Sequence, residues 1–470
     1  MKYQLRPYQQ EAVTKGVEFL TSNEQGGAII VVPTAGGKAL IIASIAKALS
    51  GNTLVLQPSL EILLQNVEKA QAFGIDDIQI YSASANQKTI GKLTFATIGS
   101  IINKKELFDN FQHLIIDEVA AVNAKGGMYE ELINHMGGVV LGLTATPYRL
   151  HAYTDFRTGK LSVVAKFLHR TRPRLFSKII HITQVQELYK MGYLCPIIYS
   201  QKEDYDHSQL KLNSTGMNFD EKSVEIYNKA HNIINIASEI VSKEDSKHIL
   251  VFTQSVAESE ALVANLLHRG ITASVVTAKT PKKDRAQILA DFKNGKIRVV
   301  CNCQTMTTGY DFPALDCVIL ARPTQSVALY GQMVGRGIRI FPGKESVKLI
   351  DLAGNVKRFG RIETFEIVEE KPNMHRLKSD ASFLTGYCFY HNEDLEARGY
   401  AGLKETVFAK RDEIIQFGLH KGKHISKTPQ GYLEWGAKSL KGSWQKMFQK
   451  EIERRLNSRT EKVNDNISPF

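Results

Sequence analysis

The sequence predicts an α/β fold with two tandem parallel-sheet domains and a small C-terminal module. Short apolar runs rich in β-branched residues alternate with longer helical patterns, as expected for parallel strands joined by helices. This alternation occurs twice, over residues 26–146 and again over 247–354. The length of 470 residues also favours several domains, because about 150 residues per domain is typical.

The individual elements follow from the apolar runs in chain order. In the first cycle we expect strands at 26–32, 52–58, 92–98, 113–119 and 138–146, with helices at 39–49 and 59–73. In the second cycle we expect strands at 247–255, 271–278, 297–303, 315–323 and 346–354. The alternation is lost after about residue 370. The predicted domains are therefore 1–190, with a basic insert after 150, then 191–368 and 369–470.

Composition limits the classes of partner and compartment. The net charge of +12 and the pI of about 9.2 favour an acidic partner, with nucleic acid ahead of an anionic membrane. A soluble protein that is merely basic stays an alternative. No apolar run reaches the about 18 residues of a membrane span, and the N-terminus lacks a secretory core. The five cysteines show no CxxC pair, so we expect no zinc ribbon, a reducing cytosol, and buried strand positions for Cys301 and Cys303.

The first candidate site is the stretch VVPTAGGKAL at residues 31–40. It follows a predicted strand and precedes a predicted helix, so backbone N–H groups and the helix N-terminus are placed to hold phosphate oxygens. Lys38 would contact the β- and γ-phosphates, with Thr34, Gly36 and Gly37 in the loop. Ala39 stands where a Ser or Thr hydroxyl usually binds Mg²⁺. On its own the match is weak, because Gly-Gly-Lys also occurs in ordinary turns.

Two further motifs strengthen the prediction of a nucleotide site. LIIDEV places Asp117 and Glu118 at the end of an apolar strand, where Asp117 suits Mg²⁺ and Glu118 suits activation of an attacking water. YGQMVGRGIRI places Gln332, Arg336 and Arg339 at helical spacing. Two arginines that face a domain cleft stabilise charge on a transferring phosphoryl group. The competing interpretations are a solvated loop start and a basic surface helix.

Six motifs in order resemble those of the superfamily 2 helicases. LRPYQQ is similar to the adenine-recognition motif, PTAGGKA to motif I, and DEVA stands where DEAH or DECH is usual. TATP, TTGYDFP and QMVGRGIR resemble motifs III, V and VI. Such an ordered set is far more specific than any single motif. The resemblance implies two RecA-like domains with ATP and Mg²⁺ between them, Gln9 and Arg6 at the adenine, and Gly309 and Asp311 near the ribose or the domain interface.

Within the superfamily, LRPYQQEAV, TTGYDFPALD and RPTQSVALYGQMVGRGIRIFPGK look similar to RadD-type bacterial helicases and to phage UvsW-type branched-DNA helicases. The chain departs from the RadD type because it has no cysteine-rich C-terminal region. Its tail, FGLHKGKHISKTPQGYLEW, instead resembles a small module of some exonucleases and phage proteins. The resemblance thus implies a phage or mobile-element enzyme in a bacterial or phage-infected cytosol.

The same resemblance implies a nucleic-acid track across both domains. Small hydroxyls and backbone N–H groups in such a track contact phosphates without reading sequence. For each residue alone, a helix cap or turn residue is a fair alternative. The positions that match are Pro58, Ser59, Gln65, Thr97 and Ser100 in the first domain, and Thr253, Gln254, Thr307 and Thr308 in the second.

Two basic segments lie outside the motor motifs. The insert contains Arg170, Arg172 and Arg174, for which a DNA grip near a fork and a solvated loop are equally good interpretations. In the tail, Tyr432, Trp435 and Trp444 stand among lysines, which fits base stacking but also a small helical core. We favour a DNA-binding module whose aromatic residues are mostly core.

The predicted function is an ATP- and Mg²⁺-dependent DNA helicase or translocase that acts on branched or forked DNA, with no membrane partner. One alternative is a double-strand translocase that does not separate strands. A second, from a different class, is a hydrolysis-impaired DNA-binding protein, favoured only by Ala39. RNA as the substrate also stays open.

Overall fold

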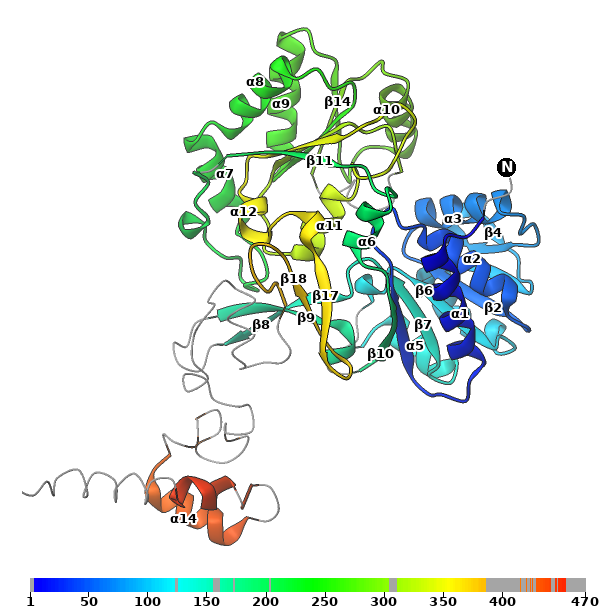
Figure 1. Cartoon of the computed structure of the whole chain (residues 1–470), viewed down its shortest axis with the longest axis vertical. Coiled ribbons are helices and arrows are strands. Elements are labelled where there is room, and N and C mark those ends of the chain that lie inside the picture. The colour runs from blue at the N-terminus through cyan, green and yellow to red at the C-terminus, as the bar shows by residue number, and fades with distance from the viewer. Residues whose placement is uncertain are drawn as a thin grey trace, which may run out of the picture.

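The computed structural model describes residues 4–122, 126–154, 161–171, 174–202, 204–303 and 311–385, and in the tail residues 415, 420, 423, 425, 428–440, 444–445 and 447–453. Over these residues the chain forms two separate sheets of mainly parallel strands with helices packed on them (Figure 1). Among the described helices, none combines the length and the apolar character that a bilayer crossing requires.

The first sheet has eight strands in the order β10-β1-β7-β6-β2-β5-β3-β4. All neighbours are parallel except β3 and β4. Its central strands are buried along their whole length, as expected when helices cover both faces of a parallel sheet. The strands are β1 (Gly27–Val31), β2 (Thr53–Gln57), β3 (Gln79–Ser82), β4 (Gln87–Lys88), β5 (Leu93–Thr97), β6 (His113–Asp117), β7 (Val140–Thr144) and β10 (Phe176–Ile182).

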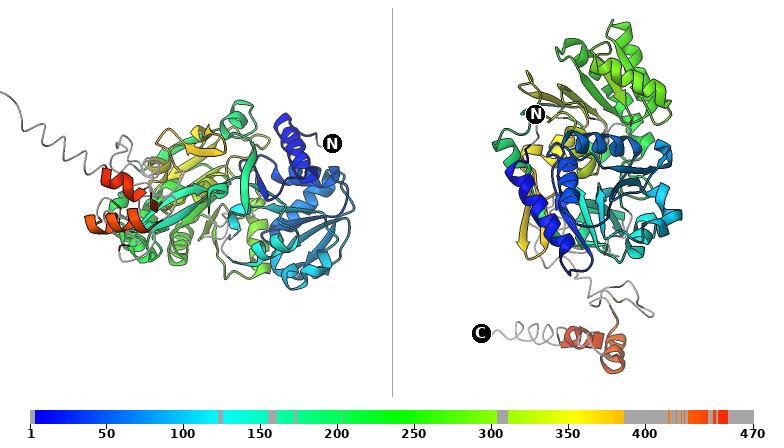
Figure 2. Two further views of the ribbon diagram at one scale, coloured as in Figure 1. Left: turned by 90° about the horizontal axis from the view of Figure 1, so that it is seen from below. Right: turned by 90° about the vertical axis from the view of Figure 1, so that its right-hand side faces the viewer.

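The helices of this domain connect the strands and lie on the sheet. Figure 2 shows α1 along the outer surface of the domain. They are α1 (Pro7–Thr21), α2 (Lys38–Ala48), α3 (Leu60–Ala72), α4 (Ile98–Ile101) and α5 (Met128–His135), with 3₁₀ turns η1 (Ala83–Ala85), η2 (Ile102–Phe108), η3 (Val119–Ala121) and η4 (Leu168–Arg170).

The second sheet has six strands, all parallel, in the order β11-β16-β15-β12-β14-β13. They are β11 (Ile197–Gln201), β12 (Ile249–Thr253), β13 (Ala273–Val276), β14 (Val299–Asn302), β15 (Cys317–Ala321) and β16 (Val347–Asp351). The helices are α6 (Val185–Lys190), α7 (Glu221–Ala230), α8 (Ile233–Lys243), α9 (Val256–His268), α10 (Lys282–Lys293), α11 (Val327–Val334) and α12 (Asn355–Phe359), with η5 (His207–Gln209) and η6 (Ile362–Thr364).

The predicted α/β fold is confirmed, and all ten strands expected from apolar runs are present. Eight further strands were not expected: the short strands β3 and β4, the sheet-edge strands β10 and β11, the antiparallel pair β8 (Tyr148–Thr154) and β9 (Leu161–Phe167), and the two strands of a hairpin described next. The pair β8 and β9 lies in the segment expected to be a basic insert, but its apolar side chains Val163, Val164 and Phe167 are buried. Cys301 and Cys303 are buried free thiols at β14, as predicted.

A second hairpin, β17 (Glu366–Lys371) and β18 (Met374–Lys378), follows the second sheet and packs back on the first domain. Gln184 donates to the carbonyl of Ile367 at 2.7 Å and accepts from its N–H at 3.0 Å. The predicted boundary at residue 368 falls inside β17, so the described fold continues through this hairpin to residue 385.

In the tail, the helix α14 (Gln430–Ser439) lies apart from both sheets (Figures 1 and 2). Ile415, Ile425, Leu433 and Phe448 form its buried core, and Tyr432 and Trp444 pack against that core. Trp435 is 46% exposed. Of the three aromatic residues singled out from the sequence, Tyr432 and Trp444 therefore pack on the core, and Trp435 is largely open to solvent.

Candidate functional site between the two domains

A cavity of about 390 Å³ lies between the two domains. One wall carries the glycine-rich loop and the ends of β6 and β7, and the other carries residues that follow β14 and α11. The predicted site residues that line it are Arg6, Thr34, Gly37, Lys38, Ala39, Asp117, Glu118, Asp311, Gln332, Arg336 and Arg339. The geometry thus brings together motifs that lie up to about 300 residues apart in the chain.

The glycine-rich loop turns sharply between β1 and α2. Gly37 is the N-cap of α2 with φ of 83°, a backbone conformation that glycine adopts without strain. A Cβ on Gly36 would lie 2.6 Å from Cγ1 of Val32, so only glycine fits there. Ala35 also has a positive φ of 69°, which costs energy because its Cβ crowds the backbone. The predicted strand–loop–helix context of Lys38 is therefore present.

The ammonium of Lys38 is paired with the carboxylate of Glu118 at 2.7 Å. Glu118 directly follows β6 and has a left-handed backbone, with φ of 51° and ψ of 51°. Its other oxygen is 3.4 Å from the hydroxyl of Thr144 at the end of β7. The lysine expected at the phosphates and the carboxylate expected at the water thus face each other across the site, where a nucleotide would have to separate them.

Asp117 is buried at the end of β6, and both of its oxygens accept hydrogen bonds. Asn66 Nδ2 donates to one oxygen at 2.9 Å, and the N–H of Glu118 donates to the other at 2.9 Å. Burial and the neighbouring charge of Glu118 raise the pKa of Asp117 to about 6, against the lowering effect of Lys38. A divalent cation would favour the ionised form of this carboxyl.

The donor set fits Mg²⁺ held mainly by its nucleotide. Among the described residues, no group of three or more His, Cys, Asp or Glu side chains is placed to hold a metal. Mg²⁺ commonly keeps several waters and binds one or two carboxylates plus substrate phosphates. Asp117 supplies such a carboxylate beside Ala39, which offers no side-chain oxygen.

Arg336 and Arg339 reach the cavity from the turn after α11. Burial lowers the pKa of Arg336 to about 10, and the neighbouring charge of Arg339 acts in the same direction. Burial also lowers the pKa of Arg339, while Asp311 opposes that effect. Arg336 is buried and Arg339 is half-buried, so placing the two guanidinium groups together costs free energy, and a polyphosphate would compensate their charge.

Gly335 lets this turn touch the phosphate loop. A Cβ at Gly335 would lie 2.8 Å from the Cγ2 atom of Thr34, in the other domain. A glycine is therefore required where the arginine-bearing turn meets the loop that holds Lys38.

The adenine motif contacts the phosphate loop itself. Tyr8 Oη and Gln9 Nε2 both donate to the carbonyl of Gly36, at 2.9 and 3.1 Å. Gln9 Oε1 accepts from the N–H of Arg6, and the Arg6 guanidinium lies 3.8 Å from the ring centroid of Tyr193. Gln9 thus braces the loop, while Arg6 and Tyr193 form a flat surface in the cavity wall. Gly36 lies behind this loop and is not among the lining residues.

Asp311 links the two domains at the cavity edge. It accepts from Lys69 of α3 at 2.6 Å and pairs with Arg339 at 3.1 Å. These two cations lower its pKa against the effect of burial. Asp311 therefore occupies the interdomain network, one of the two places expected for it, and Gly309 lies outside the described residues.

The residues expected to contact nucleic acid in the first domain fall into two groups. Thr97 and Ser100 share a hydrogen bond of 2.9 Å near Ser82, at the carboxyl end of β5. Ser59 is the N-cap of α3 and accepts from Ile62 N, which is the alternative role, and Pro58 precedes it half-buried. Gln65 lines the cavity between the domains, and its contact with nucleic acid stays a prediction.

In the second domain the expected side chains are mostly enclosed. The Thr253 hydroxyl is buried and bonds Ser255 O at 3.0 Å and Ser259 Oγ at 2.6 Å, so it supports α9 rather than facing a ligand. Gln254 is also buried. Thr307 and Thr308 lie outside the described residues.

Of the three arginines in the basic insert, Arg170 is half-buried, Arg174 is exposed, and Arg172 lies outside the described residues. Arg170 ends η4, next to the buried His169. These arginines lie in the segment from the end of η4 to the start of β10, and the DNA-grip and solvated-loop interpretations of that segment both stay predictions.

Sequence reasoning missed Asn66, Lys69 and Tyr193, which all line the cavity. Asn66 bridges Gln57 and Asp117 with two hydrogen bonds of 2.9 Å from its amide. Asn66 and Lys69 face the cavity from one side of α3, a helix with a clear apolar face, and the spacing of three residues is the available signal. Nothing in the local sequence marks Tyr193.

Comparison with known proteins agrees with this division of the chain. The family described as "Type III restriction enzyme, res subunit" matches residues 2–149, and the "Helicase conserved C-terminal domain" matches residues 229–341. IRC3 of Saccharomyces cerevisiae, named as an ATP-dependent helicase, is 25% identical over 368 residues. That match covers 74% of this chain but about half of IRC3, 51%.

Two further proteins extend this similarity. The DNA 3'-5' translocase XPB2 of Sulfurisphaera tokodaii is 26% identical over 377 residues, covering 72% of this chain and 79% of that protein. The structure of the Type ISP restriction-modification enzyme LlaBIII bound to DNA superimposes with a TM-score of 0.52 at 18% identity. It covers 74% of this chain and 28% of that one, and it supports the fold alone.

None of these proteins separates the RadD-type from the UvsW-type branch, so that finer resemblance stays a prediction. The two family models fall in order on the two sheet domains, and IRC3 and XPB2, which each match about three quarters of this chain, carry helicase and translocase names. The chain therefore belongs to the superfamily 2 helicases, a superfamily of nucleic-acid-dependent ATPases.

Proposed function

We propose that this protein is an ATP- and Mg²⁺-dependent DNA helicase or translocase that acts on branched or forked DNA. One observation carries the proposal: Lys38, Asp117 and Glu118 of one domain face Arg336 and Arg339 of the other across a single cavity. Such an arrangement serves phosphoryl transfer, because catalysis there consists mainly of positioning and charge stabilisation.

Each group has a defined task in this proposal. Lys38 leaves Glu118 and binds the β- and γ-phosphates, and the released Glu118 orients and deprotonates the attacking water. Bound Mg²⁺ would supply charge neutralisation at the phosphates, with Asp117 as its protein ligand. Arg336 and Arg339, with Gln332 beside them, stabilise the charge that develops on the transferring group.

DNA is preferred over RNA as the track because XPB2, which matches 72% of this chain, is named as a DNA translocase. The net charge of +12 is consistent with binding to a phosphate backbone. The branched or forked preference rests on the resemblance to RadD-type and UvsW-type enzymes, and the expected location is a bacterial or phage-infected cytosol.

The decisive experiment measures ATP hydrolysis without nucleic acid and then with single-stranded, duplex and forked DNA of equal length. We expect the largest stimulation by forked DNA. Strand displacement and triplex displacement by the same preparation then separate a helicase from a translocase that leaves the duplex intact. An absence of ATPase activity on every substrate would contradict the proposal.

A second candidate, a hydrolysis-impaired DNA-binding protein, is favoured by Ala39 alone. In the cavity wall Ala39 leaves one Mg²⁺ ligand position for a water. We expect a working site that needs several-fold more free Mg²⁺ than an Ala39→Thr variant. Mg²⁺ titrations of both proteins test this, and activity that appears only in Ala39→Thr would favour the second candidate.

A further inference from the structure

Lys344 contacts the backbone of the turn that carries Arg336 and Arg339. Its ammonium donates to three backbone carbonyls, those of Gly337 at 2.5 Å, Arg339 at 3.0 Å and Pro313 at 3.0 Å. An ammonium has three N–H donors and no acceptor, so these three bonds use its full capacity. Lys344 is the last residue of the stretch RPTQSVALYGQMVGRGIRIFPGK, and the sequence alone assigned it no role.

The first two carbonyls belong to the segment that follows a helix. α11 ends at Val334, and Gly337 and Arg339 lie three and five residues beyond it. Carbonyls beyond a helix C-terminus lack partners in the helix, and a cation there is also favoured by the helix dipole. Lys344 therefore holds the backbone of this turn by hydrogen bonds, while the Arg339 side chain points into the cavity.

The third carbonyl ties this turn to a different segment. Pro313 lies two residues after Asp311, the carboxylate that pairs with Arg339. Lys344 thus holds together the backbone on both sides of the Asp311–Arg339 ion pair. Both Pro313 and Arg339 line the nucleotide cavity.

The burial of Lys344 makes its charged form costly in free energy. Burial lowers its pKa to about 8, while the nearby Cys195 and Asp316 oppose that shift. A buried ammonium is expensive unless its hydrogen bonds are satisfied, and here all three are. A lysine that served only to fill space would be better replaced by an apolar side chain.

We propose that Lys344 is a positioning residue for ATP hydrolysis, which fixes the backbone of Arg339 against the Asp311–Pro313 segment so that its guanidinium meets the transferring phosphoryl group. The inference rests on the proposed ATPase function. It adds a residue that touches neither nucleotide nor metal and acts only through Arg339.

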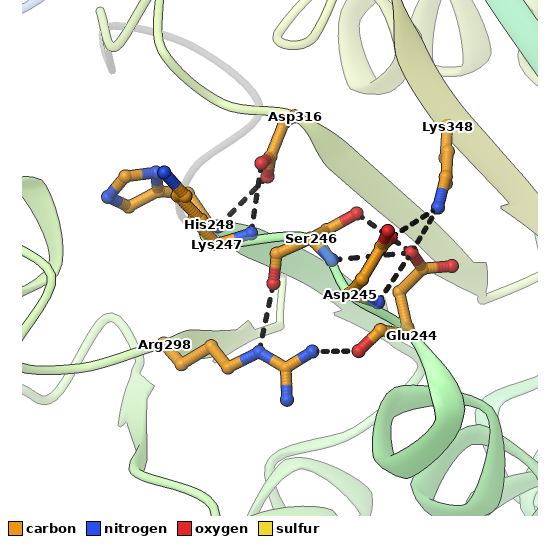
Figure 3. A network of polar contacts seen from close by, with 8 residues as sticks. All are labelled: Glu244, Asp245, Ser246, Lys247, His248, Arg298, Asp316 and Lys348. Atoms are coloured by element: carbon orange, nitrogen blue, oxygen red, sulfur yellow. Dashed lines mark hydrogen bonds and ion pairs between the residues drawn. The ribbon is translucent and has the colours of Figure 1, made fainter.

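The test compares Lys344→Met with Lys348→Met. Lys348 is a matched control because it is also a doubly paired lysine four residues away, with Glu244 at 2.5 Å and Asp245 at 2.6 Å. Figure 3 shows that its network joins the loop before β12 to Arg298, Asp316 and Lys348, and none of the residues drawn lines the cavity. Methionine keeps most of the lysine stem in both variants and removes the charge.

We expect Lys344→Met to lower kcat for DNA-stimulated hydrolysis by about 10- to 100-fold, since small misplacements of a catalytic group have effects of this size. KM for ATP should change less than about threefold, because Arg339 acts mainly on the transition state. Lys348→Met should keep both parameters within about twofold of the parent. A lower kcat in both variants, or a rise of KM alone, would overturn the proposal.

A binding measurement separates this proposal from the proposed function. Lys344→Met should bind ADP with the affinity of the parent but lose about tenfold in affinity for ADP with aluminium fluoride, which mimics the transferring group. Equal affinity of the parent and the variant for the mimic overturns the role of Lys344 alone. A parent protein that binds neither ligand overturns the proposed function and this inference together. If Lys344→Met does not fold, Lys344→Gln replaces it, since glutamine keeps two N–H donors. Lys344→Gln should lose part of the affinity for ADP with aluminium fluoride. An affinity equal to that of the parent would overturn the role of Lys344.

Discussion

The two sheet domains have the same topology and divide the chemistry between them. In chain order, β1, β2, β3, β5, β6 and β7 of the first sheet take the same relative places as β11, β12, β13, β14, β15 and β16 of the second. The difference lies in the loops that follow equivalent strands.

After β1 the first domain has the glycine-rich loop and Lys38, whereas after β11 the second has Lys202, paired with Asp204 at 2.5 Å. After β6 come Asp117 and Glu118, whereas β15 is followed by the buried Arg322. The first domain is therefore built to hold phosphates and a cation. The second offers guanidinium groups from the end of α11, and an active site needs both walls.

The largest difference between the two domains should appear when the lysine in each of the two equivalent loops is replaced by alanine. Lys38→Ala should lower kcat for hydrolysis by about 100-fold or more, because a preorganised charge at the phosphates is lost. Lys202→Ala should leave kcat within about twofold, since an exposed ion pair contributes little. DNA binding should survive in both. Steady-state ATPase assays with saturating forked DNA provide the comparison, and equal losses would show that the two loops are not functionally distinct.

The next test concerns the second wall. Arg339→Ala should lower kcat by about 1000-fold, the lower range for an arginine supplied in this way, with a much smaller change in nucleotide affinity. Arg336→Ala should act in the same direction. The exposed Arg269 at the end of α9 provides a control, and Arg269→Ala should behave like the parent. If Arg339→Ala weakened ATP binding without slowing turnover, the second domain would be a binding wall and not a catalytic one.

A pH test sharpens the role of the first wall. The pKa of Asp117 is raised to about 6, so a proton competes with Mg²⁺ below that pH. We expect the Mg²⁺ concentration for half-maximal ATPase to rise several-fold between about pH 7.5 and about pH 5.5. In Asn66→Leu the midpoint of this effect should move to higher pH, because the Asn66 hydrogen bond lowers the pKa of Asp117.

The contribution of Asp117 to folding stability changes with pH in the opposite direction to that of an ordinary salt-bridged carboxylate, whose pKa is lowered on folding. The folded pKa of Asp117 lies above its usual value of 3.8, so between about pH 4 and 6 the folded protein binds more protons than the unfolded chain. Stability contributed by this group therefore declines as the pH rises through that window. An Mg²⁺ requirement that is flat across these pH values would show that Asp117 is not the metal ligand.

The sequence predicted the strands and loops that form the two walls of the cavity better than it predicted the contacts between those walls. Strands buried on both faces have continuous apolar runs, so the central strands and the loops after them were predictable. The edge strands β10 and β11 were missed because polar side chains such as Ser177, Lys178 and Ser200 interrupt their apolar runs. The place of Gln65 in the cavity wall was not predicted, because helix periodicity alone does not say which neighbour a polar face meets. The contact of Tyr193 with Arg6 and the bond from Lys344 to Pro313 join segments distant in sequence, for which a single sequence has no signal.

The smallest expected effect concerns Ala35 in the phosphate loop. Its φ of 69° costs about 1 to 2 kcal/mol for a residue with a Cβ, whereas glycine adopts that conformation freely. Glycine also makes the unfolded chain more flexible, which offsets about 0.4–1 kcal/mol of the gain. Ala35→Gly should therefore raise the free energy of unfolding of the first domain by at most about 1 kcal/mol.

Ala257→Gly is the matched control, because Ala257 is exposed in the first turn of α9 and should lose about 1 kcal/mol on the same exchange. Denaturant titration of both variants, followed with and without ATP, measures the two changes. If Ala35→Gly raises the free energy of unfolding and Ala257→Gly lowers it, the backbone strain lies in the phosphate loop. A loss of stability in Ala35→Gly would mean that the loop relaxes to an ordinary turn when no nucleotide is bound, so that the left-handed conformation belongs to the bound state alone.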